Sequence, residues 1–157
     1  MGIKIKKEPK PQNVKLKELK VKYTLAVPLI GVIDILTMMS CYLNPVNAEN
    51  TFAKAFFIFF AIVGAGYAYW GLKWKIVSDN KKIMVCPAFG RVKEIQYSDI
   101  KKVEVHKKPK NKVLLHFSLH GANDEIFVKV YPIMNNSGEL LERLKRLGIT
   151  IQEMEGR

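Results

Sequence analysis

The sequence predicts an α+β membrane protein, with an N-terminal two-helix transmembrane hairpin followed by a small antiparallel β-barrel or sandwich that a C-terminal helix caps. Two long apolar stretches near the N-terminus predict the hairpin. Downstream of them, short alternating runs separated by turn residues predict the strands. The 26 Lys+Arg and 14 Asp+Glu side chains gather outside the apolar stretches. With only two cysteines, Cys41 and Cys86, the chain is not a disulfide-stapled secreted scaffold.

The charge divides the chain into three segments. Residues 1–22 carry eight lysines against two glutamates, and we interpret them as a basic cytoplasmic tail. Residues 23–72 contain three charged side chains in all, whereas residues 73–157 hold 17 basic and 10 acidic ones. The formal charge of +12 therefore flanks an almost uncharged centre, which is typical of a membrane anchor attached to a cytoplasmic domain.

The central segment predicts two transmembrane helices over residues 23–43 and 52–72. A helix needs about 20 mostly apolar residues to cross the hydrocarbon core, and both stretches reach that length. The connecting residues 44–50 are few, polar and turn-forming, so the helices should form a hairpin. A buried hairpin of a soluble protein and a signal peptide cleaved near Ala48 are the alternatives. They fit less well, because the apolar stretches are long and are flanked by lysines.

The flanking charges also predict how the hairpin is oriented. The basic tail and the lysines just after the second helix, Lys73 and Lys75, contrast with a connecting loop that carries only Glu49. Because positive residues stay on the cytoplasmic side, we expect a multi-pass protein of the cytoplasmic membrane with both termini in the cytoplasm. Aromatic residues crowd the end of the second helix as in an interfacial belt: Tyr67, Tyr69, Trp70 and Trp74.

Asp34 is the costliest residue of the predicted hairpin, because a charge in the middle of a membrane helix costs a few kcal/mol, on the order of 3. The second helix has no basic residue at matching depth, but it offers small residues that allow close backbone approach, including Gly64 and Ala68. We expect these three residues to meet in a helix–helix contact, either within the hairpin or between copies in a homo-oligomer. The alternative is that Asp34 is a tolerated lone acid without a role.

After the hairpin the pattern changes to six short runs with strand character: residues 74–77, 83–86, 92–97, 100–106, 113–120 and 126–130. A helix is then predicted over residues 136–147, because its leucines recur with a period of 3.6 residues. Asn136 and Glu139 have the spacing of a capping box at its start. Gly148 stands where a left-handed residue would end it.

These runs contain residues that resemble a known family. A strand beginning at Trp74 follows the membrane helices, and Tyr97, Asp99, Ile100 and Val103 follow a Tyr/Pro-x-Asp-Ile-x-x-Val pattern. In this respect residues 67 to about 148 resemble bacterial membrane-anchored pleckstrin-homology-like (PH-like) domains. The resemblance implies a bent antiparallel barrel of seven strands closed by a helix. Six runs are clear here, so either the seventh strand lies in residues 149–153 or one run is split.

Nothing in the sequence predicts an enzyme, a cofactor or a metal site. There is no glycine-rich phosphate loop, no nucleophile elbow and no pair of carboxylates on a helix face. His116 and His120 share one strand face, but four residues in a strand separate them by roughly 13 Å, so they cannot both bind one zinc ion. The motif shared with PH-like domains marks a fold and carries no catalytic residue.

The candidate binding surface is a set of basic residues, which we call the lysine set: Arg91, Lys101, Lys102, Lys107, Lys108, Lys110 and Lys112. If the strands form a meander that starts at the membrane, its turns alternate between far and near. Residues 107–112 then face the anionic leaflet, where each basic residue contributes about 1 kcal/mol. The bland alternative is a solvated basic surface.

Two functions remain open on these grounds. The first is a non-enzymatic, membrane-anchored PH-like module that binds anionic lipid head groups or a protein partner at the cytoplasmic face. The second is a structural or assembly subunit of a membrane complex that acts through its hairpin. We do not expect nucleic acid as a partner, because no surface aromatic residues interleave with the lysines.

Overall fold

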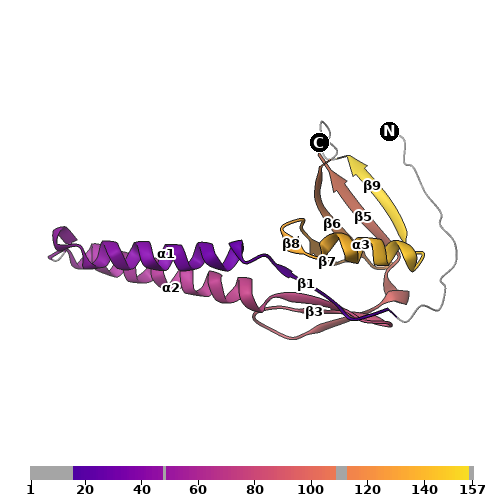
Figure 1. The fold of residues 1–157 in the computed structure, drawn as a ribbon, viewed down its shortest axis with the longest axis horizontal. Helices are drawn as coiled ribbons and strands as arrows, with labels where there is room; N and C mark the ends of the chain where they lie inside the picture. Colours follow the sequence, from indigo (N-terminus) through magenta and orange to yellow (C-terminus); the bar gives the residue numbers. More distant parts are fainter. Residues whose placement is uncertain (1–15, 48, 109–112, 156–157) are drawn as a thin grey trace. The chain divides into compact units, whose positions relative to one another are not determined.

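The computed structural model describes residues 16–47, 49–108 and 113–155, which divide into two compact units (Figure 1). The helical unit is Tyr23–Trp74 together with Pro87–Gly90. The β unit comprises the described residues before Tyr23, then Lys75–Cys86, and the described residues from Arg91 onward.

The helical unit is an antiparallel pair of helices, α1 (Ala26–Leu43) and α2 (Thr51–Lys73), with a short 3₁₀ turn, η1 (Pro45–Asn47), between them. Oδ1 of Asn50 accepts a hydrogen bond from the backbone N–H of Ala53 at 3.0 Å, which caps the start of α2. Both predicted helices are therefore confirmed within a few residues. Both helices are long and apolar enough to cross a membrane. In each helix, only 17% of its apolar 18-residue window is buried.

The β unit contains two sheets. The order of the first sheet is β4-β3-β2-β1-β8, and that of the second sheet is β7-β6-β5-β9. The strands are β1 (Leu19–Tyr23), β2 (Lys75–Ser78), β3 (Lys82–Cys86), β4 (Lys93–Gln96), β5 (Lys102–Lys107), β6 (Leu114–His120), β7 (Ile126–Val130), β8 (Met134–Asn135) and β9 (Thr150–Glu155). A 3₁₀ turn, η2 (Tyr97–Asp99), joins β4 to β5, and α3 (Ser137–Arg146) lies between β8 and β9 in the chain. All six predicted strands are present.

Strand β1 corrects the interpretation of residues 1–22 as a tail, because its residues belong to the first sheet. It pairs antiparallel with β2, in a register that places Lys22 opposite Lys75 and Val21 opposite Ile76. Leu19 and Val21 are buried while Lys20 is exposed, which is the alternation of a half-buried strand. Lys20 and Lys22 therefore occupy the outer face of the strand, while Leu19 and Val21 enter the core.

Strand β9 shows that the expected strand near residues 149–153 exists, and it also corrects the expectation of a purely antiparallel sheet. It pairs in parallel with β5, and Val103 lies opposite Ile151. Parallel neighbours need a long crossover between them. Here that crossover runs through β6, β7, β8 and α3.

The core of the β unit is formed by the apolar faces of both sheets and by one side of α3. Ile76 and Ile83 of the first sheet, Phe117 of the second sheet, and Leu140 and Leu144 of α3 are fully buried. Figure 1 shows α3 lying between the two sheets. The helix therefore closes the core, as its leucine stripe predicts.

The ends of α3 were predicted with mixed success. Gly148 has φ = 75°, so the predicted left-handed residue after the helix is confirmed. The capping box is wrong, because Asn136 is itself left-handed (φ = 62°) and makes no side-chain cap. Its Nδ2 donates instead to the carbonyl oxygen of Lys20 at 3.0 Å, which connects the start of the helix to β1.

Candidate functional site

The lysine set does not form one patch. Lys101 and Lys102 lie at the start of β5, whereas Lys107 and Lys108 lie at its end, roughly 17 Å away along an extended strand. Arg91 is exposed before β4, in the other sheet. Lys110 and Lys112 lie outside the described residues. Most of these residues have neighbouring sequence numbers, but the extended conformation of β5 holds the two groups of lysines at opposite ends of the strand.

Two members of the lysine set already have acidic partners. Nζ of Lys102 lies 2.7 Å from Oδ1 of Asp124 and 2.9 Å from Oε1 of Glu104. Hydrogen bonds to Asp124 and then to Glu104 raise the pKa of Lys102. Nζ of Lys107 lies 2.7 Å from Oε1 of Glu153. These partners reduce the net positive charge that β5 offers to an anionic surface.

The predicted alternation of turns near to and far from the membrane does not follow from the observed strand order. Such an alternation requires one continuous meander, but β4 and β5 belong to different sheets and are not paired. The chain crosses between the sheets at η2, so the direction of the turns in the second sheet does not follow from that of the first. The lysine set therefore has no structural support as a membrane-facing turn.

The outer face of β5 and β6 carries a polar network that the sequence analysis missed. The register places Glu104 opposite Ser118 and Lys102 opposite His120. Oε2 of Glu104 lies 3.3 Å from Nε2 of His120, and Oγ of Ser118 lies 2.8 Å from the same nitrogen. The hydrogen bond from Lys102 is the main cause that lowers the pKa of Glu104, so this carboxylate is charged at neutral pH.

This network is not a nucleophilic triad. In a Ser-His-acid triad the serine and the acid contact opposite nitrogens of the imidazole. Here both contact Nε2, and Nδ1 of His120 faces the backbone carbonyl oxygen of Asp124 at 3.3 Å. Ser118 is only 2% exposed, so no substrate could reach its hydroxyl. The network joins β5, β6 and the following turn.

The other two histidines form a stacked pair beside this network. The ring centroids of His106 and His116 are 4.4 Å apart and the rings are nearly parallel, at 13°. Within residues 16–47, 49–108 and 113–155, no three His, Cys, Asp or Glu side chains are placed to hold a metal ion. Burial lowers the pKa of His116, and the neighbouring His106 and Lys129 lower it further.

We expect the protein to lose stability as the pH falls from neutral, in part because of His116. Its folded pKa lies below the usual 6.5, so the unfolded chain binds more protons and is favoured as the pH passes below 6.5. The free energy of unfolding, measured in detergent between about pH 7.5 and 5.5, should fall less for His116→Gln than for the unchanged protein. Equal slopes for the two proteins would contradict this assignment.

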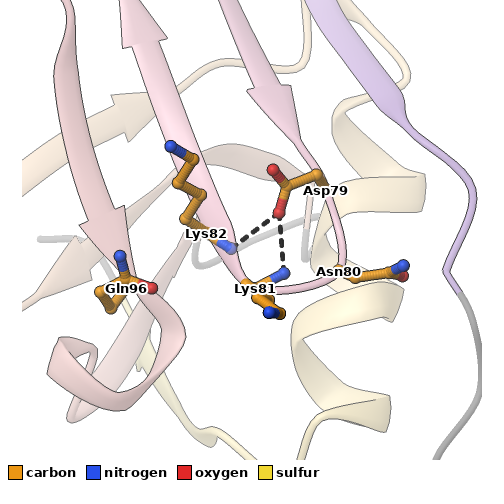
Figure 2. A pocket seen from close by; sticks show the side chains of 5 residues that line it. All are labelled: Asp79, Asn80, Lys81, Lys82 and Gln96. Atoms are coloured by element: carbon orange, nitrogen blue, oxygen red, sulfur yellow. Dashed lines mark hydrogen bonds between the residues drawn. The ribbon is translucent and has the colours of Figure 1, made fainter.

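The β2–β3 turn borders an open hollow of about 410 Å³, lined by Asp79, Asn80, Lys81, Lys82 and Gln96 (Figure 2). Oδ1 of Asp79 accepts hydrogen bonds from the backbone N–H groups of Lys81 at 2.7 Å and Lys82 at 2.9 Å. These bonds lower the pKa of Asp79 and hold the turn. The carboxylate is thus used structurally, and the hollow contains no nucleophile or acid–base pair.

Behind this turn, Ser78 is the centre of a buried hydrogen-bond network. The hydroxyl of Tyr97 lies 2.7 Å from Oγ of Ser78 and donates to the carbonyl oxygen of Asp79 at 2.9 Å. Nη1 of Arg143, on α3, donates to both the carbonyl oxygen and Oγ of Ser78 at 2.9 Å. Its Nη2 donates to the carbonyl oxygen of Lys17. One guanidinium therefore connects α3, β2 and the chain before β1.

In the helical unit, the structure brings Asp34, Gly64 and Ala68 into one helix crossing. A Cβ atom on Gly64 would lie 2.6 Å from Oδ2 of Asp34. A Cβ atom on Gly31 would lie 2.5 Å from the carbonyl oxygen of Gly64 and 2.7 Å from the backbone nitrogen of Ala68. The contact therefore exists within a single hairpin, and glycine is needed for the backbones to approach this closely.

Aromatic side chains surround the end of the helical unit where α1 begins and α2 ends. The Tyr23 ring lies between the rings of Trp70 and Trp74, at centroid distances of 4.7 and 5.2 Å. Tyr69 contacts Phe89 of the β3–β4 turn at 5.3 Å. The aromatic residues at the end of α2 were predicted from the sequence, whereas Tyr23 and Phe89 were not, because they come from other segments.

Comparison with known proteins gives no relative: no family model matches the sequence, no curated protein matches it, and no solved structure matches its fold. We therefore infer the function from the geometry of the chain itself.

Proposed function

We propose that this chain is a non-enzymatic, membrane-anchored PH-like module that acts at the cytoplasmic face of a membrane and binds anionic phospholipid head groups. The observation that carries the proposal is the apolar exterior of α1 and α2. A core helix of a soluble protein is mostly buried, whereas here only 17% of each apolar window is. Leu36 and Ile62 are about two-thirds exposed, which is costly in water and favourable in lipid.

The strand order supports the PH-like part of the proposal. Strands β1 to β4 are consecutive neighbours in one sheet, β5 to β7 are consecutive neighbours in the other, and a helix follows. Strands β1 to β7 number seven, which is the number that the resemblance implies, and only the two-residue β8 stands between them and the closing helix. The short β8 and the parallel β9 are additions to that pattern.

The second candidate, an assembly subunit acting through its hairpin, receives less support. Asp34 was the residue that suggested contacts between copies. Its carboxylate packs against Gly64 of the same chain, so the hairpin places this acid without a second copy.

A topology experiment tests the anchoring and its direction. In a background with Cys41→Ser and Cys86→Ser, we expect Glu49→Cys to react with a membrane-impermeant maleimide on intact cells. Asn123→Cys, in the exposed β6–β7 turn, should react only after the cells are permeabilised, because lysines keep the β unit inside. Labelling of Asn123→Cys on intact cells, or recovery of the protein in the soluble fraction, would refute the proposal.

A further inference from the structure

We propose that the turn Pro87–Gly90, called here the Phe89 turn, inserts into the interfacial layer of the bilayer as a second point of attachment. In the same attachment, Lys22 and Lys75, called here the lysine pair, bind the phosphates of anionic phospholipids. The inference rests on the proposed function, because it takes the hairpin to lie in the bilayer.

The Phe89 turn belongs to the helical unit, although it connects two strands of the β unit. The Phe89 ring contacts the ring of Tyr69 on α2, with centroids 5.3 Å apart, and is nevertheless 68% exposed. Nζ of Lys73 lies 5.9 Å from the centroid of that same tyrosine ring. A large apolar side chain thus remains uncovered beside the last turns of a helix that we place in the membrane.

Phe89 also continues an aromatic surface. Tyr23, Trp70 and Trp74 cluster where α1 begins and α2 ends, and aromatic residues of this kind occupy the level of the lipid head groups. Since Tyr69 lies one residue before Trp70, Phe89 extends this layer beyond the helices. A loop residue at this level has the same reason to enter the interface as the helical ones.

The lysine pair supplies the charge. Lys22 on β1 lies directly opposite Lys75 on β2, and both side chains are exposed. Like charges at directly opposed positions of neighbouring strands repel each other. In the described part of the chain, neither lysine has an acidic partner. A phosphate group between them would remove that repulsion.

Register and connectivity place the pair and the turn at the same end of the first sheet. Cys86, the last residue of β3, lies opposite Lys75, and the chain enters the Phe89 turn directly after it. The same end is where β1 runs toward α1 and where β2 follows α2 after a single residue, Trp74. The lysine pair, the point where the chain enters the Phe89 turn and the connections to α1 and α2 therefore all lie at one end of the first sheet.

This combination favours a bilayer over a soluble partner. An interface of charged head groups above acyl chains matches exposed lysines that adjoin the helix ends in the chain and an exposed phenylalanine that contacts α2. The acidic side chains of the β6–β7 turn have cationic partners of their own: Asp124 lies 2.7 Å from Nζ of Lys102, and Glu125 lies 3.2 Å from Nζ of Lys93.

The test uses the full chain in nanodiscs, with a nitrobenzoxadiazole (NBD) probe at single cysteines in the Cys41→Ser, Cys86→Ser background. We expect the probe at Ala88→Cys to emit at shorter wavelength and to be quenched by lipids brominated near the head group. The shift and the quenching should decrease with Phe89→Ser and return with Phe89→Trp. A probe at Asn80→Cys, in the exposed β2–β3 turn at the opposite end of β2 from Lys75, should show neither.

A probe at Ile62→Cys separates this inference from the proposed function. Quenching at Ile62→Cys by lipids brominated deep in the acyl chain supports the spanning hairpin, and its absence refutes the proposed function. If Ile62→Cys is quenched while Ala88→Cys behaves like Asn80→Cys, only the Phe89 turn is refuted.

The lysine pair is tested in the same nanodiscs, with and without phosphatidylglycerol. Phosphatidylglycerol should raise the ratio of the Ala88→Cys probe population inserted in the lipid interface to the population exposed to water. The factor by which phosphatidylglycerol raises this ratio should be about 5-fold smaller for each of Lys22→Gln and Lys75→Gln. Lys129→Gln, an exposed lysine of β7, is the matched control and should keep the gain. An unchanged gain in both pair variants would overturn the assignment of the lysines.

Discussion

Replacing Arg143 with alanine should lower the free energy of unfolding of the β unit by about 2–4 kcal/mol. The guanidinium donates to the backbone and side chain of Ser78, which is fully buried, and to the carbonyl oxygen of Lys17. Its removal leaves buried acceptors without their charged donor, and a hydrogen bond to a charged group contributes about 1.5–3 kcal/mol. Water cannot easily replace the donor at a buried serine.

The effect of Arg143→Ala can be measured by denaturation of the full chain in detergent micelles. Hydrogen exchange of the β2 and β3 amides, read by mass spectrometry, shows whether the loss is located at Ser78. Arg146→Ala is the matched control, because Arg146 is exposed and makes no side-chain bond in the described part of the chain. If the two variants lose equal stability, the Ser78 network does not hold α3 to the first sheet.

Replacing Gly31 with alanine should destabilise the hairpin by about 1–3 kcal/mol, the usual cost of overpacking. The new Cβ atom would lie 2.5 Å from the carbonyl oxygen of Gly64 and 2.7 Å from the backbone nitrogen of Ala68. Both obstacles are backbone atoms, so rotation of a side chain cannot relieve them. The helices would have to separate, which would also loosen the contact of Asp34 with Gly64.

Both tryptophans of the chain lie in the aromatic cluster with Tyr23, so their fluorescence reports whether α1 and α2 stay together. We expect Gly31→Ala to lower the SDS concentration at which this signal changes. Gly66→Ala is the control, because a Cβ atom there meets nothing within 4 Å. An equal shift for both variants would show that close approach at Gly31 does not stabilise the pair.

The helices and most strands could be predicted because each has a recognisable pattern within its own residues. A run of about 20 apolar residues or a short alternation needs no knowledge of the rest of the chain. Strand β1 has the same alternation, with Leu19 and Val21 buried, but its lysines counted toward a charged tail. The lysine-rich composition of residues 1–22 therefore concealed the two-residue alternation of buried and exposed side chains in the five residues of β1.

The polar network could not be predicted, because it depends on register. Glu104 and His120 are separated by sixteen positions, and only the pairing of Glu104 with Ser118 brings them together. The described members of the lysine set are spread apart for the opposite reason, since neighbours in sequence were taken as neighbours in space, and binding by them stays a prediction. Along an extended strand, Lys102 and Lys107 are at opposite ends and each has found its own acid.

The pairing of β1 with β2 has a consequence for how the chain is made. The helical pair α1 and α2 occupies the place of a tight turn between two adjacent strands, so the ribosome completes β1 long before β2 exists. Closing so long a loop costs little extra entropy, because this cost grows only with the logarithm of its length. Strand β1 can pair with β2 only after both helices have been synthesised. Until then its β2 side is an open edge, available to proteases and chaperones.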